Sequence, residues 1–273
     1  GKIMMLLVTF VVTALLLPVL SSGLVATEGF ARLEELYPTA GLGERVRLGK
    51  LAQGLRSGTA LRPQDPEQAR TYGEFSVESF ATCVDAALEG LPDDLAFVDV
   101  GSGTGRLAMA ASLLFPERFR TVRGLEISPL LHSEATATLR RAEDEGFVER
   151  GTVFFERKDV LEEHETVDGN FFFVYATAFP APTFSEELRA PILNDQWTTT
   201  LAKMLEGRPC RILTTDRALN PAVGFKMVDV IANLPNRETL TSTVYVHDFD
   251  GIVRAGPAIS TDDDDEWRRW KSR

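Results

Sequence analysis

Short, continuous apolar runs recur along the chain and alternate with longer stretches in which apolar residues follow the helical period. Apolar runs without polar alternation are typical of strands buried on both faces of a parallel sheet. The runs predict seven strands, at residues 96–100, 121–128, 153–160, 170–176, 210–214, 226–232 and 241–249. The last two strands follow each other without a helix between them.

Helical periodicity fills the intervals between most of these strands. It predicts helices at residues 106–114, 129–145 and 186–205, and two more before the first strand, at 30–37 and 77–88. Ser76 precedes one of these helices as an N-cap, and Gly146 ends another. Alternating strands and helices indicate an α/β fold in which a mostly parallel sheet carries helices on both faces.

The N-terminal segment is apolar and has no polar face. Residues 3–20 are almost wholly apolar, Lys2 precedes them, and small residues follow at positions 21–23. This pattern indicates a secretory signal peptide within residues 1–23. A short membrane anchor, an organellar pre-sequence and a buried core helix are the alternatives.

Composition divides the rest of the chain into three parts. Glycines and prolines multiply between residues 41 and 66, which predicts a linker or a loosely packed cap over residues 24–70. Residues 71–250 hold the alternating strands and helices and form the predicted main domain. In the tail, residues 251–273, an acidic run is followed by basic residues, and we expect a disordered, self-compensating end.

Length, charge and cysteine content narrow the function classes. A chain of 273 residues, 44% apolar and 25% charged, has the composition of a globular protein of one or two domains. Its net charge of −11 disfavours binding to nucleic acid. The two cysteines, Cys83 and Cys210, form no metal-binding pattern and are predicted core thiols, and no metal is expected.

The first strand leads into a glycine-rich turn and then a helix. Gly101, Gly103 and Gly105 alternate directly after this strand. Glycine permits a tight turn and lets a ligand approach the backbone. A dinucleotide-binding turn has its third glycine one position later, where this chain has Arg106. The spacing is instead that of the first motif of class I S-adenosylmethionine (SAM) methyltransferases. A plain strand-to-helix turn is the alternative.

Acidic residues end the second and third strands. Glu126 lies about 20 positions after the glycine turn, where a carboxylate accepts hydrogen bonds from the ribose hydroxyls of a bound adenosine. Asp159 follows the third strand, where an acid often accepts the adenine amine in SAM-binding folds. A solvated Glu and an Asp that caps the next turn are the alternatives for these two positions.

A loop at residues 177–182 follows the fourth strand. Open α/β sheets bind their substrates at the carboxyl ends of the strands, so this loop is predicted to face the reacting group. Tyr175 and Phe179 either line a substrate pocket there or belong to the core.

Several segments together resemble one family. They read TYGEFS, FVDVGSGTG, GLEIS, KDVLEE, FFFVYATAF and VYVH. In this order and approximate spacing they are similar to the disruptor-of-telomeric-silencing (Dot-one) family, the non-SET histone lysine methyltransferases, over residues 72–250. The resemblance implies a Rossmann-like seven-stranded SAM methyltransferase sheet with an N-terminal helical cap, and SAM as the cofactor.

The resemblance also implies which residues hold the cofactor and the substrate. A loop with Tyr72 and Glu74 would fold over the methionine half of SAM. The expected cofactor contacts are Tyr72, Glu74, Asp99, Gly101, Gly103, Gly105, Glu126, Ile127, Asp159 and Val160, and the expected substrate pocket contains Tyr175, Phe179 and Tyr245. The chain departs from the family at Tyr175 and Ala176, which replace an asparagine pair, and at Val244, which replaces an aromatic residue.

We therefore expect a SAM-dependent methyltransferase that methylates a protein lysine or another nucleophile. A small-molecule methyltransferase and a binding module without catalysis are the alternatives, and Arg106 argues against a nicotinamide oxidoreductase. The expected partner is a protein or small-molecule methyl acceptor, with membrane contact only through residues 3–20. A histone substrate implies the nucleus, whereas the N-terminal segment indicates the secretory pathway or an organelle.

Overall fold

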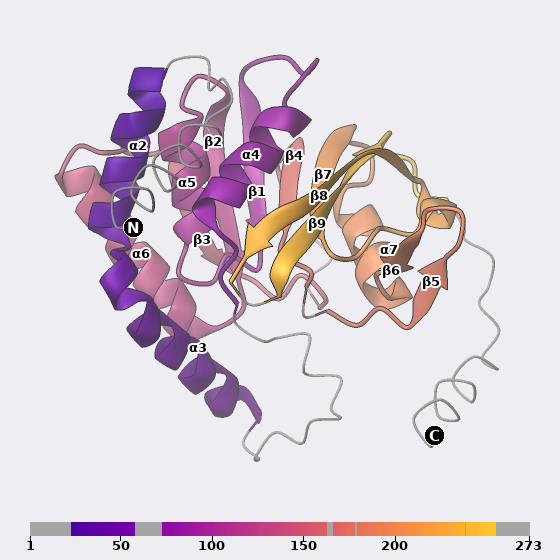
Figure 1. Cartoon of the computed structure of the whole chain (residues 1–273), viewed down its shortest axis with the longest axis horizontal. Coiled ribbons are helices and arrows are strands. Elements are labelled where there is room, and N and C mark those ends of the chain that lie inside the picture. The colour runs from indigo at the N-terminus through magenta and orange to yellow at the C-terminus, as the bar shows by residue number, and fades with distance from the viewer. Residues whose placement is uncertain (1–22, 58–72, 163–165, 178, 238, 255–273) are drawn as a thin grey trace, which may run out of the picture.

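The computed structural model describes residues 23–57, 73–162, 166–177, 179–237 and 239–254, and a mixed sheet forms its centre (Figure 1). The strands of this sheet are β1 (Leu95–Val100), β2 (Phe119–Glu126), β3 (Val153–Arg157), β4 (Phe171–Val174), β7 (Cys210–Thr215), β8 (Phe225–Asn236) and β9 (Leu240–Phe249). Their order is β3-β2-β1-β4-β7-β9-β8. The first five strands in this order pair in parallel, and β9 runs antiparallel between β7 and β8.

This strand order is that of the Rossmann-like methyltransferase sheet, and the predicted fold class is confirmed. The short strand β4 shows why the buried strands appear in the sequence as continuous apolar runs. Its four residues, three phenylalanines and Val174, are completely buried. A strand covered by helices on both faces has no position for a polar side chain, so it is apolar throughout.

Helices cover both faces of the sheet. They are α2 (Gly23–Leu36), α3 (Leu42–Ser57), α4 (Val77–Ala87), α5 (Arg106–Leu114), α6 (Pro129–Asp144) and α7 (Asp195–Met204), with 3₁₀ turns η1 (Thr39–Gly41) and η3 (Pro221–Val223). One hydrophobic cluster joins α2, α4, α5 and α6 to the face that carries Phe97. A second cluster joins α7 to the opposite face, which carries Val98. Neighbouring residues of β1 thus point into different cores.

The register brings the carboxyl ends of the parallel strands to one edge. Val100 of β1 lies opposite Leu125 of β2 and Val174 of β4, and Val174 lies opposite Thr214 of β7. The glycine turn, Glu126 and the loop after β4 therefore start from the same level of the sheet. This edge is where open α/β sheets bind their ligands.

The N-terminal region contains a helix where a linker or a loosely packed cap was expected. Glycines at positions 43, 49 and 54 suggested irregular chain, but α3 spans Leu42–Ser57. Each glycine costs a helix about 1 kcal/mol relative to alanine, and tertiary packing overrides this cost. α3 packs beside α6 (Figure 1), and its Ala52 is buried.

The region before α7 is also different from the prediction. One helix was expected over residues 186–205, but a two-stranded hairpin, β5 (Thr183–Ser185) and β6 (Ala190–Ile192), occupies its first part. Arg189 has a positive φ of 51° and Pro191 lies in β6, and neither feature suits a helix interior. The helix begins only after Asn194, whose side chain accepts a hydrogen bond from the Trp197 backbone.

The two ends of the chain, including residues 3–20 and most of the 251–273 tail, lie outside the described residues, as does Tyr72. Within the described ranges, none of the helices is long and apolar enough to span a membrane. The signal-peptide prediction and the predicted domain boundaries remain predictions.

Candidate active site

A cavity of about 1090 Å³, counting space open to solvent, lies at the carboxyl edge of the sheet. Its walls come from the glycine turn, the ends of β2, β3 and β4, the segment before α4, and helices α3 and α7. Most predicted site residues line it: Glu74, Asp99, Gly101, Gly103, Glu126, Ile127, Asp159, Val160, Tyr175 and Phe179. Residues distant in sequence are thus brought to one site.

The three glycines of the turn have different surroundings. All have positive φ, of 82° at Gly101, 58° at Gly103 and 84° at Gly105, which L side chains rarely adopt. A Cβ at Gly101 would meet no atom within 4 Å, and Gly101 lines the cavity. A Cβ at Gly105 would lie 2.4 Å from the ring of Phe155, and Gly105 is not among the lining residues. Gly105 therefore permits close packing, and its expected cofactor contact is not supported.

Glu126 links the end of β2 to the glycine turn. Its side chain is buried, and one carboxylate oxygen accepts a hydrogen bond from the Gly103 amide at 2.9 Å. The other oxygen accepts from the Ser128 amide at 2.6 Å. These two bonds hold the carboxylate at the floor of the cavity, in a fixed orientation.

A second carboxyl group lies beside Glu126. Asp99 is 3% exposed, and burial, together with the nearby negative charge of Glu126, raises the pKa of its carboxyl to about 7. A buried acid next to a carboxylate resists ionisation unless a positive charge comes close. The floor of this cavity therefore favours a cationic ligand.

The end of β3 forms the next part of the wall. Asp159 and Val160 line the cavity, and an Asp159 oxygen accepts a hydrogen bond from the Leu161 amide at 3.0 Å. The Asp159 carboxylate thus caps the turn that follows it, as the alternative prediction for this residue had it. The same residue also borders the cavity. Lys158 also lines the cavity and is 8% exposed. The sequence reading did not single out this lysine.

Aromatic side chains form the wall beyond β4. Tyr175 and Phe179 line the cavity together with Phe75 and Trp197, which the sequence reading missed. The Phe179 and Trp197 rings are stacked, with centroids 4.3 Å apart and an interplanar angle of 16°. The Tyr175 hydroxyl accepts a hydrogen bond from the Asn236 amide at 3.2 Å.

Tyr245, the third expected substrate-pocket residue, is not among the described residues that line the cavity. Its ring packs with Ala190, Ile192 and Ala218 under the β5–β6 hairpin. Burial and the nearby Asp216 raise the pKa of its hydroxyl. The hairpin, which was predicted to be part of a helix, packs against this tyrosine. The place of Tyr245 in a substrate pocket therefore stays a prediction, which the lining of this cavity does not support.

A polar network fixes the loop that follows β4. The Thr177 hydroxyl donates a hydrogen bond to Asp216 at 2.6 Å, and Ser242 donates to the same carboxylate at 2.9 Å. Arg217 donates to the carbonyls of Thr177 and Phe179 at 3.0 and 3.3 Å. The aromatic wall is therefore held by residues after β7.

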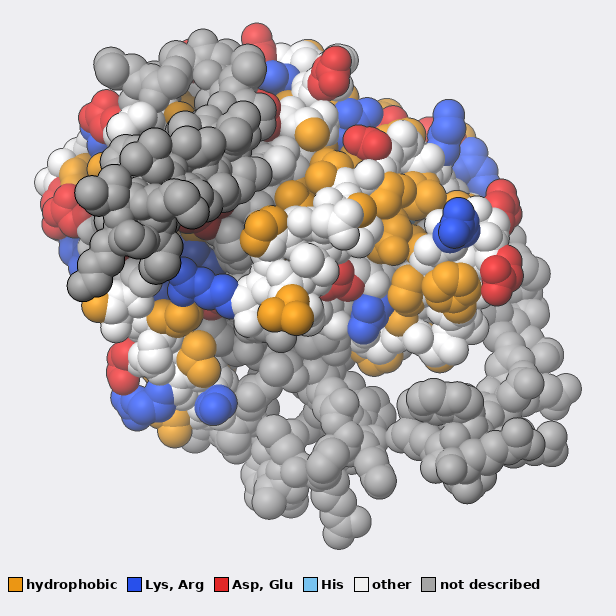
Figure 2. All heavy atoms as spheres, in the orientation of Figure 1, with side chains coloured by type: hydrophobic (Ala, Val, Ile, Leu, Met, Phe, Trp, Pro, Cys, Tyr) orange, Lys and Arg blue, Asp and Glu red, His pale blue; other side chains and the backbone are white. Residues whose placement is uncertain are grey.

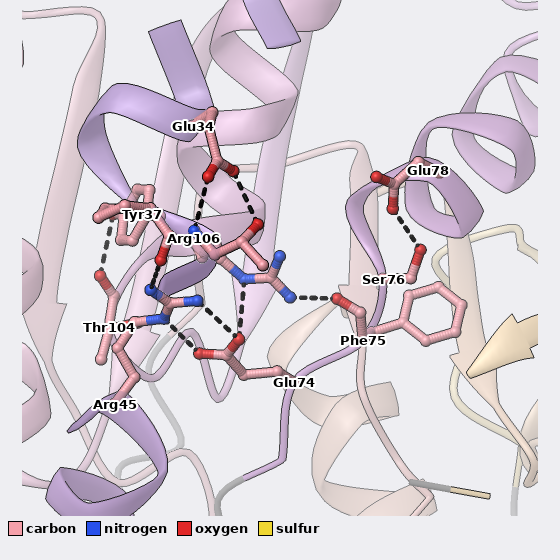
Figure 3. A network of polar contacts seen from close by, with 11 residues as sticks. Glu34, Tyr37, Arg45, Glu74, Phe75, Ser76, Glu78, Thr104 and Arg106 are labelled. Atoms are coloured by element: carbon pink, nitrogen blue, oxygen red, sulfur yellow. Dashed lines mark hydrogen bonds and ion pairs between the residues drawn. The ribbon is translucent and has the colours of Figure 1, made fainter. Parts of the chain in front are cut away.

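Charged residues also line the cavity, and Figure 3 shows their polar contacts. Glu74 and Arg106 line it, and Arg45 of α3 pairs with Glu74 from behind, at 2.7 Å. Nearby, the buried Tyr37 hydroxyl donates to the Thr104 carbonyl at 3.0 Å and ties the N-terminal helices to the glycine turn. Because Gly49 and Ala52 of α3 also line the cavity, α3 forms its cover on this side.

The last features of the described residues to consider are possible metal ligands, the cysteines and the surface charge. Among the described residues, no group of three or more His, Cys, Asp or Glu side chains is arranged to hold a metal ion. Cys83 and Cys210 are both buried, as predicted for core thiols. On the face shown in Figure 2, Lys and Arg side chains lie among Asp and Glu without a continuous basic area.

The arrangement of strands, glycine turn and cavity identifies the architecture. The fold is the Rossmann-like methyltransferase fold. No protein-family model matches the chain, and no curated protein matches it. Solved structures do match, at low identity.

Three of these structures are methyltransferases. Magnesium protoporphyrin IX methyltransferase from Synechocystis PCC 6803, solved with bound SAM, is 13% identical over 76% of this chain and 91% of that chain, with a TM-score of 0.45. A putative RNA methyltransferase from Pyrococcus horikoshii is 14% identical over 74% and 98%, with a TM-score of 0.44. An rRNA methyltransferase from Streptomyces viridochromogenes is 16% identical over 64% and 86%, with a TM-score of 0.44. The likeness concerns the fold, and nothing in it points to the Dot-one family.

Proposed function

We propose that this chain is a SAM-dependent methyltransferase and that the cavity binds SAM. The observation that carries the proposal is the floor of the cavity. Gly101 leaves open space beside the backbone, and Glu126 is fixed by the Gly103 amide at the end of the neighbouring strand. A ligand with a ribose and a cationic centre fits this pair of features, since the carboxylate accepts from hydroxyls and the acidic floor favours positive charge.

The strand order supports one orientation of the donor. Asp159 and Val160 beyond β3 would hold the adenine, Glu126 beyond β2 would hold the ribose, and Asp99 with the glycine turn beyond β1 would lie near the sulfonium. The acceptor then enters beyond β4, where the aromatic wall begins. This orientation follows the order β3-β2-β1-β4 along the edge of the sheet.

SAM supplies an activated methyl group on a sulfonium when it is bound. The part of the chain in such a transfer would be to align the acceptor and to exclude water. The aromatic residues Tyr175 and Phe179 suit both tasks. They present flat, apolar surfaces, and the loop after β4 is held rigidly by Asp216 and Arg217.

We further propose an amine acceptor, with a protein lysine as the first candidate. An apolar aromatic wall lowers the pKa of an entering ammonium, so that it loses its proton and becomes nucleophilic. The net charge of −11 favours a basic protein over a nucleic acid as partner. The Dot-one resemblance supports the same acceptor, although Tyr245 takes no part in the wall.

Calorimetric titration with S-adenosylhomocysteine tests the donor site. We expect saturable binding to the wild-type protein and at least tenfold weaker binding to Glu126→Gln. Glu156→Gln is the matched control, because Glu156 lies on the neighbouring strand β3, pairs with Arg123 and does not line the cavity. A folded wild-type protein that binds neither SAM nor S-adenosylhomocysteine would rule out the proposal.

A panel of acceptors tests the amine proposal. Release of S-adenosylhomocysteine is measured with lysine peptides, histones, small amines and RNA. We expect turnover with lysine or amine acceptors, reduced when Tyr175 or Phe179 is replaced by alanine. Turnover on RNA alone would overturn the amine assignment, and donor binding without any turnover would favour a non-catalytic binding module.

A further inference from the structure

A series of hydrogen bonds connects the residue after β7 to Tyr175 in the aromatic wall. Asp216 follows β7, and its carboxylate accepts a hydrogen bond from the Ser242 hydroxyl of β9 at 2.9 Å. The Ser242 oxygen accepts from the side-chain amide of Asn236, the last residue of β8, at 2.6 Å. The same amide nitrogen donates to the Tyr175 hydroxyl at 3.2 Å. We call these four residues the Asp216–Tyr175 network.

The carboxylate sets the direction of the bonds in this network. Asp216 accepts from the Ser242 hydroxyl and from a backbone amide, and an ionised carboxylate can only accept. Because the single hydroxyl proton of Ser242 goes to Asp216, the Ser242 oxygen accepts from Asn236. The amide nitrogen of Asn236 therefore faces Ser242, and its second hydrogen goes to Tyr175. The Tyr175 oxygen is thus an acceptor toward Asn236.

The middle of the network lies inside the protein. Ser242 is 2% exposed and Asn236 is 4% exposed. Buried polar groups cost free energy unless they form hydrogen bonds, and a satisfied network holds its members in one geometry. Apolar side chains could join the end of the β8–β9 pair to the sheet without this requirement. The polar residues add a fixed direction at the place where Tyr175 begins the aromatic wall.

Tyr175 is held by its ring and by its hydroxyl. The ring packs against Phe75, with centroids 5.7 Å apart and an interplanar angle of 37°, and the hydroxyl is bound by Asn236. Tyr175 lines the cavity, whereas Asn236, Ser242 and Asp216 are not among the described residues that line it. Any effect of these three residues on an acceptor is therefore indirect, through the position of Tyr175.

We infer that Asn236 is a positioning residue for methyl transfer, which holds Tyr175 in the aromatic wall, and that Asp216 fixes the orientation of the Asn236 amide through Ser242. This inference rests on the proposed function and gives the β8–β9 pair a part in the reaction. A change at Asp216, which has no direct bond to Tyr175 in this network, should therefore alter the surroundings of the Tyr175 hydroxyl.

NMR of the full chain tests the network without an acceptor. Tyrosine is isotope-labelled at Cζ, whose chemical shift responds to the hydrogen bonds of the hydroxyl, and the Tyr175 signal is the one lost in Tyr175→Phe. We expect this signal to move in Asn236→Ala, which removes the donor. It should also move in Asp216→Asn, which keeps the shape of the side chain but adds a donor that competes with Ser242.

Ser79 of α4 offers a matched control. Its buried hydroxyl donates to the carbonyl of Pro235, the residue before Asn236, at 2.7 Å. Ser79→Ala therefore removes a hydrogen bond at the same end of β8 and leaves the four residues of the network unchanged. We expect the Tyr175 signal to stay in place in this variant.

Kinetics test the role in methyl transfer. Turnover is measured as release of S-adenosylhomocysteine with lysine peptides, and donor affinity is measured by calorimetry with S-adenosylhomocysteine. We expect Asn236→Ala to lower kcat about tenfold, because a displaced wall misaligns the acceptor, while donor affinity stays within about twofold. Added to Tyr175→Phe, Asn236→Ala should lower kcat no further, since both changes act through one side chain. Ser79→Ala should change neither quantity.

Each other outcome has a definite meaning. A Tyr175 signal that stays in place in folded Asn236→Ala and Asp216→Asn overturns the inference, and the proposed function stands. An unchanged kcat in Asn236→Ala, an additive loss in the double variant or an equal loss in Ser79→Ala also overturns it. If the folded wild type turns over no acceptor, the positioning role fails together with the proposed methyl transfer, even where NMR shows the network intact.

Discussion

The floor and the cover of the cavity are built in different ways. The floor comes from a single strand–turn–helix–strand unit, in which Gly103 and Glu126 are joined by one hydrogen bond. The cover comes from helix α3, whose Arg45 pairs with Glu74 in the segment before α4. Tyr37, which follows α2, ties this region to the glycine turn through the Thr104 carbonyl. A local floor tolerates little change, whereas a cover assembled from separate contacts can loosen without unfolding the sheet.

The largest effect should come from the acid in the floor. The folded-state pKa of Asp99, about 7, lies above the value of 3.8 for a free Asp. Between pH 4 and pH 7 the unfolded chain loses this proton and the folded chain keeps it, so stability falls as pH rises. The upper limit of this loss is about 4 kcal/mol. Urea unfolding across this range should show a steeper decline for the wild type than for Asp99→Asn, and parallel profiles would contradict the assignment.

A steric change in the floor should cause the second-largest loss of stability. Gly105→Ala places a Cβ against the Phe155 ring at a φ of 84°. Backbone strain and overpacking together should lower the free energy of unfolding by about 3 kcal/mol. Chemical denaturation measures this loss. A variant as stable as the wild type would mean that the turn relaxes, and that the floor is not the rigid half of the cavity.

Loss of one contact in the cover should have a smaller effect. Tyr37→Phe removes a buried hydrogen bond to the Thr104 carbonyl, at a cost of about 1 kcal/mol. We expect faster hydrogen exchange in α3 and unchanged exchange in β1 and β2. Acceleration throughout the sheet would show that the cover and the floor unfold together.

The smallest expected effect is a gain in the stability of α3, the helix of the cover. Gly43 lies in α3 without a positive φ, and an added Cβ would meet no atom within 4 Å. Gly43→Ala should therefore stabilise the helix by about 0.5 to 1 kcal/mol. A rise in Tm is the expected readout, and a fall would place Gly43 in a contact that the helix needs.

The same contrast explains what the sequence could predict. Gly101, Glu126 and Asp159 follow strands at fixed local spacing, so their meeting at one edge follows from the parallel sheet alone. Gly105 belongs to the same motif, but it packs against Phe155, which comes from another strand. The sequence therefore could not distinguish a glycine that borders the cavity from one that permits close packing. The roles of these residues toward SAM remain proposals.

Other features depended on contacts that no local pattern records. The resemblance implied an N-terminal helical cap, but the glycines of α3 hid this helix from the sequence pattern, and packing on α6 and the contact of Arg45 with Glu74 stabilise it. The positions of Trp197, which the sequence did not single out, and of Tyr245 have one explanation. The hairpin before α7 shortens the expected helix, which brings Trp197 to the cavity and covers Tyr245.

The stacked pair of Phe179 and Trp197 gives this protein an optical probe of its own. An indole ring at the wall of the cavity changes its surroundings when the space beside it fills, and its emission should shift in colour and intensity. The chain has only two other tryptophans, both near its C-terminus, and replacing them with phenylalanine leaves a single emitter. Rapid mixing could then time the arrival of a ligand without any label.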